Sequence, residues 1–135
     1  MDYRKINAWT EKDNFPNPFM DQMLDRLAEK GWYCFLDGYS GYNKISNALE
    51  DQEKTTYTCP YGTFAFNRML FGLCNPAATF QRCMMSIFFD MVKYTIEVIV
   101  DDFSMVGYSF ERFLSHLSEV FKRCEEYNLV LNQEK

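Results

Sequence analysis

The order of apolar segments constrains the fold of this chain more than any other feature of its sequence. Short β-rich runs and longer segments with helical apolar spacing follow one another as strand, helix, strand, strand, helix, strand. The expected elements cover residues 32–36, 76–91, 94–100, 103–106, 110–127 and 129–131. This order is the ferredoxin-like, split βαβ arrangement, so we predict an α+β fold. Right-handed crossovers place the third strand between the first two and antiparallel to both.

Two further segments lie outside this frame. Asn17-Pro18 carries the cap-and-proline signal of a helix that Gly31 ends. Residues 50–53 are expected to form a turn, and the runs 54–58 and 63–66 alternate like the two strands of a hairpin. We therefore predict one extra helix before the first strand and one hairpin after it.

Capping residues mark the ends of the two long helices. Asn75-Pro76 repeats the cap-and-proline signal, Ser109 can cap the last helix, and Asn128 can end it. These signals predict the helix boundaries.

Composition is that of an ordinary globular domain. The chain has 135 residues, of which 47% are hydrophobic and 24% charged. No apolar run approaches the ~18 residues of a membrane span, and residues 1–5 lack the apolar core of a signal peptide. The net charge is −5, from 14 basic and 19 acidic residues. Taken alone, this balance argues against the basic face that is typical of nucleic-acid-binding proteins.

Cysteine usage favours an intracellular protein. The chain has five cysteines, an odd number, and no C-x-x-C pair. The single histidine, His116, is expected at the surface of a helix, so a zinc site has few ligands available. We expect the cysteines to be reduced and buried.

Acidic residues follow the first two strands of the predicted sheet. Asp37 ends the first strand, and Asp101 and Asp102 end the second. Because these strands are expected to run parallel, their carboxyl ends share one edge of the sheet. Clustered carboxylates repel one another unless a cation lies between them, and such oxygen ligands suit Mg²⁺. The pattern alone leaves an ordinary alternative, because Asp-Asp is a common turn and Asp a common strand end.

Four segments, in order, resemble the reverse transcriptase domain of gypsy-class LTR retrotransposons, most closely those of plants. They are Asp2–Asn7, Phe35–Tyr42, Phe71–Arg82 and Val98–Phe103, and the closing Leu129–Lys135 also fits. The resemblance implies the palm of a right-hand polymerase at about 32–43 and 71–135. It implies parts of the fingers at about 1–31 and 44–70, with the thumb and the RNase H domain absent from this truncated domain.

The resemblance also implies an activity and its partners. A reverse transcriptase is an RNA-directed DNA polymerase, and it adds deoxynucleotides to a primer 3′-OH with two Mg²⁺ ions. The expected partners are an RNA or DNA template-primer and deoxynucleoside triphosphates, with no membrane. The expected place is an intracellular, cytoplasmic retroelement particle. The acidic balance is then explained if basic triphosphate contacts come from fingers residues upstream of this chain.

The family pattern assigns the catalytic roles to three acids. Asp37 and Asp101 resemble the carboxylates that hold both Mg²⁺ ions, with the Gly38 carbonyl as a further ligand. Asp102 resembles the third acid of the motif, nearer the primer end.

The same resemblance assigns contacts to the incoming nucleotide. Ser40 and Gly41 would offer backbone N–H groups to the triphosphate, and Tyr42 would stack under the deoxyribose. Phe71 and Gly72 would border the nucleotide pocket. Tyr42 has a plain alternative as one more core aromatic residue.

Three basic residues carry weaker assignments. Arg4 lies in the fingers segment, where a contact with the template strand is expected. Lys135 resembles a lysine near the triphosphate, or is simply a charged chain end. Arg82 either touches nucleic acid or pairs with an acid.

Several supporting positions depart from the family pattern. Ile99 replaces the usual aromatic residue, the order within Asn75–Ala78 is inverted, and Tyr108 replaces an acid. The catalytic carboxylates are intact. This drift keeps a second hypothesis open, that the chain is a catalytically inactive, degenerate retroelement remnant. An RNA-binding module with the same element order is a third, although the aromatic signature of such modules is not visible.

Overall fold

A three-stranded sheet forms the centre of the fold. The computed structural model describes residues 2–16, 19–28, 30–39, 41–92 and 94–132. The sheet contains β1 (Trp32–Asp37), β4 (Ile96–Ile99) and β5 (Asp102–Gly107) in the order β1–β5–β4. β5 is antiparallel to both neighbours. The predicted strand order is therefore confirmed, within a mixed α+β fold.

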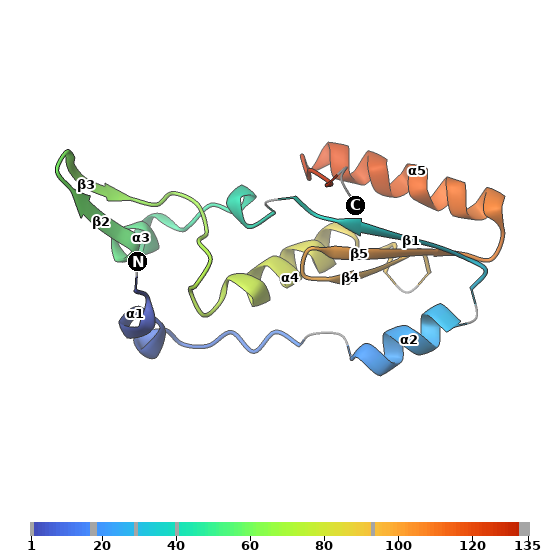
Figure 1. The fold of residues 1–135 in the computed structure, drawn as a ribbon, viewed down its shortest axis with the longest axis horizontal. Helices are drawn as coiled ribbons and strands as arrows, with labels where there is room; N and C mark the ends of the chain where they lie inside the picture. Colours follow the sequence, from blue (N-terminus) through green and yellow to red (C-terminus); the bar gives the residue numbers. More distant parts are fainter. Residues whose placement is uncertain (1, 17–18, 29, 40, 93, 133–135) are drawn as a thin grey trace.

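Two long helices cover the apolar side of this sheet. They are α4 (Pro76–Ile87) and α5 (Phe110–Glu126), and α5 runs along β1 and β5 in Figure 1. Alternation along the strands turns Phe103 and Met105 of β5 into the core, where both are almost fully buried. Phe80 and Phe88 from the α4 segment and Val120 from α5 complete the centre of this core.

Helix α2 (Met20–Ala28) lies on the opposite side of the sheet (Figure 1). Met23 is its one buried residue among those that the structure describes. Arg26 reaches from this helix to Glu97 of β4, and the two side chains form an ion pair of 2.7 Å. The helix was expected, but its signal Asn17-Pro18 lies outside the described residues, and the helix ends before Gly31.

The remaining elements lie at the other end of the molecule (Figure 1). A two-stranded antiparallel sheet pairs β2 with β3 and confirms the predicted hairpin. These elements are α1 (Arg4–Trp9), the 3₁₀ helix η1 (Gly41–Lys44), α3 (Leu49–Gln52), the 3₁₀ helix η2 (Glu53–Thr55), β2 (Thr56–Cys59) and β3 (Gly62–Ala65).

Two sequence-based expectations about local structure are wrong. The segment 50–53, expected to be a turn, is helical in α3 and η2. Residues 129–131 do not form a strand; Leu131 makes only an isolated antiparallel bridge with Gly38. The segment 50–53 consists of acidic and polar residues, so it has no apolar spacing that would predict a helix. The apolar run 129–131 is short and forms only a single bridge at the end of β1.

The helix caps differ in how they work. Asn75 occupies the N-cap position of α4, but its side chain caps nothing. Its amide nitrogen donates to the Glu11 carbonyl at 2.8 Å, and its oxygen accepts from the Asp13 N–H at 3.0 Å. Asn75 therefore holds the N-terminal segment against α4. Ser109 does cap α5, accepting from the Arg112 N–H at 3.3 Å.

Asn128 ends α5 in the left-handed conformation, as predicted. Its φ is 52°, and its N–H donates to the Glu125 carbonyl at 3.1 Å. The next N–H, of Leu129, reaches back to the Cys124 carbonyl at 2.8 Å. This pair of bonds is a Schellman motif, which satisfies carbonyls that the end of a helix leaves unpaired.

The cysteines and the single histidine differ partly from expectation. All five cysteines are free, but only Cys124 is buried, while the other four are partly exposed. His116, expected at the surface, is half-buried, and its Nδ1 lies 3.0 Å from the Val106 carbonyl. Within the described ranges, no helix is both long and apolar enough to cross a membrane.

Candidate active site

The three candidate aspartates meet at one edge of the sheet. Asp37 is the last residue of β1, and the strand register pairs it with Asp102, the first residue of β5. The Gly38 N–H donates to the Asp101 carbonyl at 2.6 Å. A Cβ added at Gly38 would lie 3.2 Å from that carbonyl oxygen and 3.6 Å from the Asp101 Cβ. The backbones that carry these acids are thus adjacent, although Asp37 is far from the others in sequence.

The turn between β4 and β5 positions Asp101. Ile99 pairs with Asp102, so the connection consists of Val100 and Asp101. We expected both acids to end the second strand, but Asp102 already belongs to β5. Val100 has a φ of 54°, a left-handed conformation that is costly for a β-branched residue and that a tight two-residue turn requires.

A buried glutamine supports this turn, and the sequence interpretation missed it. Gln81 of α4 is fully buried, and its Nε2 donates to the Val98 carbonyl at 2.8 Å. Its Oε1 accepts from the Val100 N–H. Both groups lie at the end of β4, so Gln81 ties α4 to the hairpin that carries Asp101. One signal was visible, since Gln81 interrupts the apolar stripe of α4 with a polar side chain that needs partners once buried.

Asp37 has its own support from the C-terminal segment. The Asn132 N–H donates to the Asp37 carbonyl at 2.7 Å, and the Asn132 amide lies 3.4 Å from an Asp37 carboxylate oxygen. The Tyr39 N–H donates to the Val130 carbonyl at 2.7 Å. This segment therefore fixes the end of β1 on its outer side. We had assigned no role to Asn132.

Tyr42 packs beside the aspartates. It is 6% exposed, with its ring centroid 4.5 Å from that of Phe71 and 4.8 Å from that of Phe80. The pKa of its phenol is raised, first by burial and second by the negative charge of Asp101. Tyr42 thus contributes to the core and also lies within electrostatic range of Asp101. Its predicted contact with a sugar stays a prediction.

Gly41 allows this packing. It is buried, and a Cβ at this position would lie 2.4 Å and 2.6 Å from two atoms of the Phe80 ring. The close approach of η1 to α4 therefore requires glycine here. Its neighbour Ser40, the other predicted triphosphate contact, lies outside the described residues.

Phe71 and Gly72 lie on an exposed turn before α4. Phe71 is 65% exposed, and its ring contacts that of Tyr42. Gly72 has a φ of 93°, which favours glycine, and its carbonyl accepts from the Asn7 amide at 2.7 Å. This bond joins α1 to the turn. The place of Phe71 and Gly72 at the border of a nucleotide pocket stays a prediction.

The basic residues have acidic partners. Arg82 pairs with Asp13 at 2.7 Å and lies over the Phe15 ring, which favours the structural alternative of the two that the sequence left open. Arg4 pairs with Asp2 at 2.6 Å, and its hydrogen bonds lower the pKa of Asp2. Lys135 lies outside the described residues.

The donor set at the sheet edge suits a hard cation. Within the described ranges, no three His, Cys, Asp or Glu side chains are already gathered around a metal position. Mg²⁺ needs only one or two carboxylates, completed by water and substrate phosphates. Asp37, Asp101 and the Gly38 carbonyl provide such a set of oxygen ligands, so these residues fit the Mg²⁺ that the sequence resemblance implies.

Comparison with known proteins identifies the family. A model described as reverse transcriptase (RNA-dependent DNA polymerase) matches residues 1–135. The chain belongs to the reverse transcriptase family. It is 35% identical over 123 residues to the "RNA-directed DNA polymerase homolog" of Oenothera berteroana, covering 89% of this chain and 87% of that protein.

Retrotransposon polyproteins are similar over the whole chain. The Pol polyprotein from transposon 412 of Drosophila melanogaster is 35% identical over 135 residues, and that from transposon gypsy is 31% identical. The chain covers 100% of its own length in both cases but spans only 11% and 13% of those polyproteins. A plant protein and an insect element are thus equally similar, so these identities do not single out plant-type elements.

Solved structures share the fold of this reverse transcriptase segment. The foamy viral protease-reverse transcriptase in complex with an RNA/DNA hybrid matches with a TM-score of 0.87 and 22% identity, over 99% of this chain and 18% of that one. The foamy viral protease-reverse transcriptase dRH, in complex with double-stranded DNA, matches with a TM-score of 0.85 and 21% identity, over 97% of this chain and 23% of that one.

Proposed function

We propose that this chain carries the nucleotidyl-transfer centre of an RNA-directed DNA polymerase from a retrotransposon, of the gypsy class. The observation that carries the proposal is the meeting of Asp37 with the β4–β5 turn at one sheet edge. Family membership supports the reaction class. On this proposal residues 32–43 and 71–135 are palm, and residues 1–31 and 44–70 belong to the fingers.

The roles of the residues follow from their chemistry. Two Mg²⁺ ions would stabilise the attacking and leaving oxygens of the phosphoryl transfer. Asp37 and Asp101 would hold both ions, and Asp102 would lie nearer the primer end. Gly41 would donate its backbone N–H to the triphosphate, and Phe71 and Gly72 would border the nucleotide pocket. The protein's contribution is mainly positioning and charge stabilisation.

The nucleic-acid partners are proposed from the relatives. The foamy viral enzyme was solved with an RNA/DNA hybrid and with double-stranded DNA. We infer that this segment takes a template-primer of either kind, together with deoxynucleoside triphosphates.

The alternative is a segment that folds but has lost catalysis. Drift at Ile99, Tyr108 and the Asn75–Ala78 order favours it. Two of these positions nevertheless have a structural role. Ile99 ends β4 and pairs with Asp102, and Asn75 holds the N-terminal segment against α4. Both hypotheses expect the same fold, and they differ in metal-dependent chemistry.

Metal binding tests the site in this chain directly. Mn²⁺, used as a paramagnetic substitute for Mg²⁺, should broaden the backbone NMR signals of Gly38, Asp101 and Asp102 before others. Asp37→Asn and Asp101→Asn should each remove this selective broadening. Asp25→Asn, at an exposed acid on α2, is the matched control and should leave it unchanged. Selective broadening that persists in both Asp37→Asn and Asp101→Asn would contradict the proposed site.

Primer extension distinguishes the enzyme from the remnant. A longer Pol polypeptide containing this segment should extend a DNA primer on an RNA template, and Asp101→Asn should reduce the rate at least about 10³-fold, because a ligand of both ions is lost. Selective metal binding without any extension by the longer polypeptide would favour the inactive remnant.

A further inference from the structure

A hollow lies at the opposite end of the sheet from the aspartates. The register pairs Trp32 with Gly107 at this end, five residues along β1 from Asp37. At a rise of ~3.3 Å per strand residue, the two ends are ~17 Å apart. The hollow has a volume of about 480 Å³ and lies between the end of β5, the first turns of α5 and residues 30 and 94. None of the roles proposed for the aspartates uses it.

The described lining of this hollow contains basic residues and no acidic ones. Lys30, Arg112 and His116 contribute to its walls. Among the described residues, neither Lys30 nor Arg112 forms an ion pair with a carboxylate. The chain as a whole carries a net charge of −5. An acid-free basic hollow in such a chain favours an anionic ligand.

Arg112 occupies an electrostatically unfavourable position for a cation. It lies in the first turn of the 17-residue helix α5, where the helix dipole places partial positive charge. An anion in the hollow would offset this repulsion. His116 is one turn further along, on the same face of the helix.

The tautomer of His116 follows from its contact with the backbone. Its Nδ1 lies 3.0 Å from the Val106 carbonyl, which can only accept, so Nδ1 carries the proton. Nε2 is then an acceptor, so it can bind a donor group of a ligand but not a phosphate oxygen. The bond also fixes the ring against β5, which limits the conformational entropy that a ligand must remove.

Two tyrosines supply aromatic surface beside the cations. The Lys30 ammonium lies 3.5 Å from the centroid of the Tyr108 ring, so that ring holds a cation in place. Tyr94 is 76% exposed and lines the same hollow. Exposed aromatic rings beside basic groups are the features that stack nucleobases in proteins that bind single strands.

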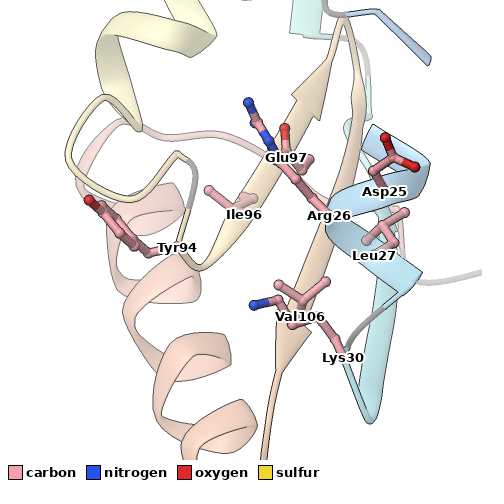
Figure 2. Close-up of a pocket in the computed structure, with 8 residues that line it drawn as sticks. All are labelled: Asp25, Arg26, Leu27, Lys30, Tyr94, Ile96, Glu97 and Val106. Carbon is pink, nitrogen blue, oxygen red and sulfur yellow. The ribbon is translucent and has the colours of Figure 1, made fainter. Parts of the chain in front are cut away.

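The hollow continues into a neighbouring one of about 270 Å³ beneath α2. The two share Lys30, Tyr94 and Val106 as walls. Figure 2 shows Arg26 reaching toward Glu97 on one side of this second hollow and Tyr94 on the other. Glu97 neutralises Arg26, and Asp25 adds a further carboxylate to the lining of the second hollow. The excess of positive charge therefore lies in the first hollow, where the phosphate is placed, and the second is left to the uncharged nucleoside.

We propose that this pair of hollows binds a phosphate group that carries a nucleoside. Lys30 and Arg112 hold the phosphate, His116 accepts a hydrogen bond from a donor group of the nucleoside, and Tyr94 stacks on the base. The phosphate comes from a free nucleotide or from a single strand, which the experiment distinguishes. The site is separate from the proposed catalytic centre and needs no divalent cation.

Equilibrium binding in EDTA tests the proposal, since chelation removes any contribution of the aspartate site. The probe is a fluorescein-labelled eight-nucleotide dT strand, followed by anisotropy, with AMP and inorganic phosphate as competitors. Arg112→Gln should weaken binding about tenfold, and Arg112→Lys should recover most of it. Lys122→Gln, an exposed cation on α5 outside the hollow, is the matched control and should change affinity less than about twofold. Displacement by AMP identifies a nucleotide site, and binding of the strand alone identifies a site for single strands.

The location is read independently of affinity. The NMR signals of Gly107, Tyr108 and Arg112 should shift on adding ligand, and removing one phosphate contact should reduce the salt dependence of binding by about one unit of slope. Three results would overturn the proposal: no binding of strand or nucleotide, equal losses in Arg112→Gln and Lys122→Gln, or inorganic phosphate competing as well as AMP. These binding and NMR results do not depend on whether the protein extends a primer, so failure of primer extension would not contradict this proposal.

Discussion

At the scale of single residues, Tyr42 is both a core residue and a neighbour of the candidate aspartate Asp101. It is packed between Phe71 and Phe80, and it lies close enough to Asp101 for the charge to raise its pKa. A ring held so firmly beside a proposed metal ligand would be well placed to exclude a 2′-OH. Rigid packing makes steric exclusion effective, since a mobile ring would yield to the extra oxygen.

Tyr42→Ala should therefore change sugar selectivity in the longer Pol polypeptide. We expect the penalty against ribonucleotides to shrink, while deoxynucleotide incorporation survives at a lower rate. Losing the buried ring should also lower the free energy of unfolding by about 3 kcal/mol. Single-nucleotide incorporation with paired dNTP and rNTP measures the ratio. Tyr42→Phe keeps the ring and serves as the control. If both rates fall together in Tyr42→Ala with an unchanged ratio, the ring acts only in packing.

Cys124 should make stability fall in alkaline solution. Burial raises the pKa of its thiol from 9.0 to about 11. The folded state thus keeps the proton that the unfolded state releases, so the stabilisation is complete below pH 9 and is lost as pH rises toward 11. The expected loss is about 2–3 kcal/mol.

Denaturant unfolding under reducing conditions at pH 7.5 and 10.5 checks this. Cys124→Ala should be less stable by about 1 kcal/mol at pH 7.5 but should lose less between the two pH values, because other groups contribute equally to both proteins. Identical pH profiles for the two proteins would show that the thiolate is not disfavoured in the fold.

At the scale of elements, the β4–β5 hairpin stores strain in its turn. Val100 holds a φ of 54° while its N–H is bonded to Gln81. Left-handed backbone costs a residue with a Cβ about 1–2 kcal/mol, and asparagine less.

Val100→Asn should consequently leave the free energy of unfolding unchanged or raise it by up to about 1 kcal/mol, although a partly buried valine is lost. Gln81→Leu, which removes both bonds to the hairpin, should lower it by about 2 kcal/mol. Urea unfolding of the two variants measures the contrast. A large loss in Val100→Asn would mean that packing of the valine side chain outweighs backbone strain.

The docking of α2 includes an ion pair between a buried carboxylate and an exposed arginine. Glu97 is 6% exposed and bonds to Arg26 at 2.7 Å. Arg26→Met should lower the free energy of unfolding by about 2 kcal/mol, because it leaves a buried carboxylate unpaired. The double substitution Arg26→Met with Glu97→Gln should recover much of this loss. Additive losses in the double-mutant cycle would mean that the pair contributes little.

The elements that the sequence predicted are those with long apolar periodicity. Strand order followed from the alternation of β-rich runs and apolar stripes, and it brought Asp37 beside Asp102 correctly. Helix α1 was not visible, because six residues with no buried member carry no periodic signal. The role of Gln81 was hidden too, because its two partners come from a strand that the sequence could not place against α4. Contacts of this kind depend on tertiary packing, which a single sequence does not state.

At the scale of the whole molecule, the aspartates lie at a partly exposed edge of the sheet. Phosphoryl transfer depends on holding the primer, the template and the triphosphate in line. This segment spans 11% of the transposon 412 polyprotein. Arg4 and Arg82, two of the basic residues considered for nucleic-acid contact, are engaged with acids.

We therefore expect the purified 135-residue chain to extend a primer poorly or not at all, even with intact carboxylates. Extension of a labelled primer on an RNA template, with Asp101→Asn as the background, measures this. Robust synthesis that depends on Asp101 would show that the chain needs no further parts of the polyprotein.

The outer side of β1 has a consequence for handling the protein. The structure places β1 at one side of the sheet, where the described C-terminal residues bond only to its end at Asp37–Tyr39. Farther along, Trp32 and Phe35 are 46% and 68% exposed. Unpaired amide and carbonyl groups beside exposed aromatic rings act as a template on which a strand from another molecule can add. Overexpression and concentration would then favour ordered self-association, and a lysine in place of Phe35 would oppose it by adding charge along the growing ribbon.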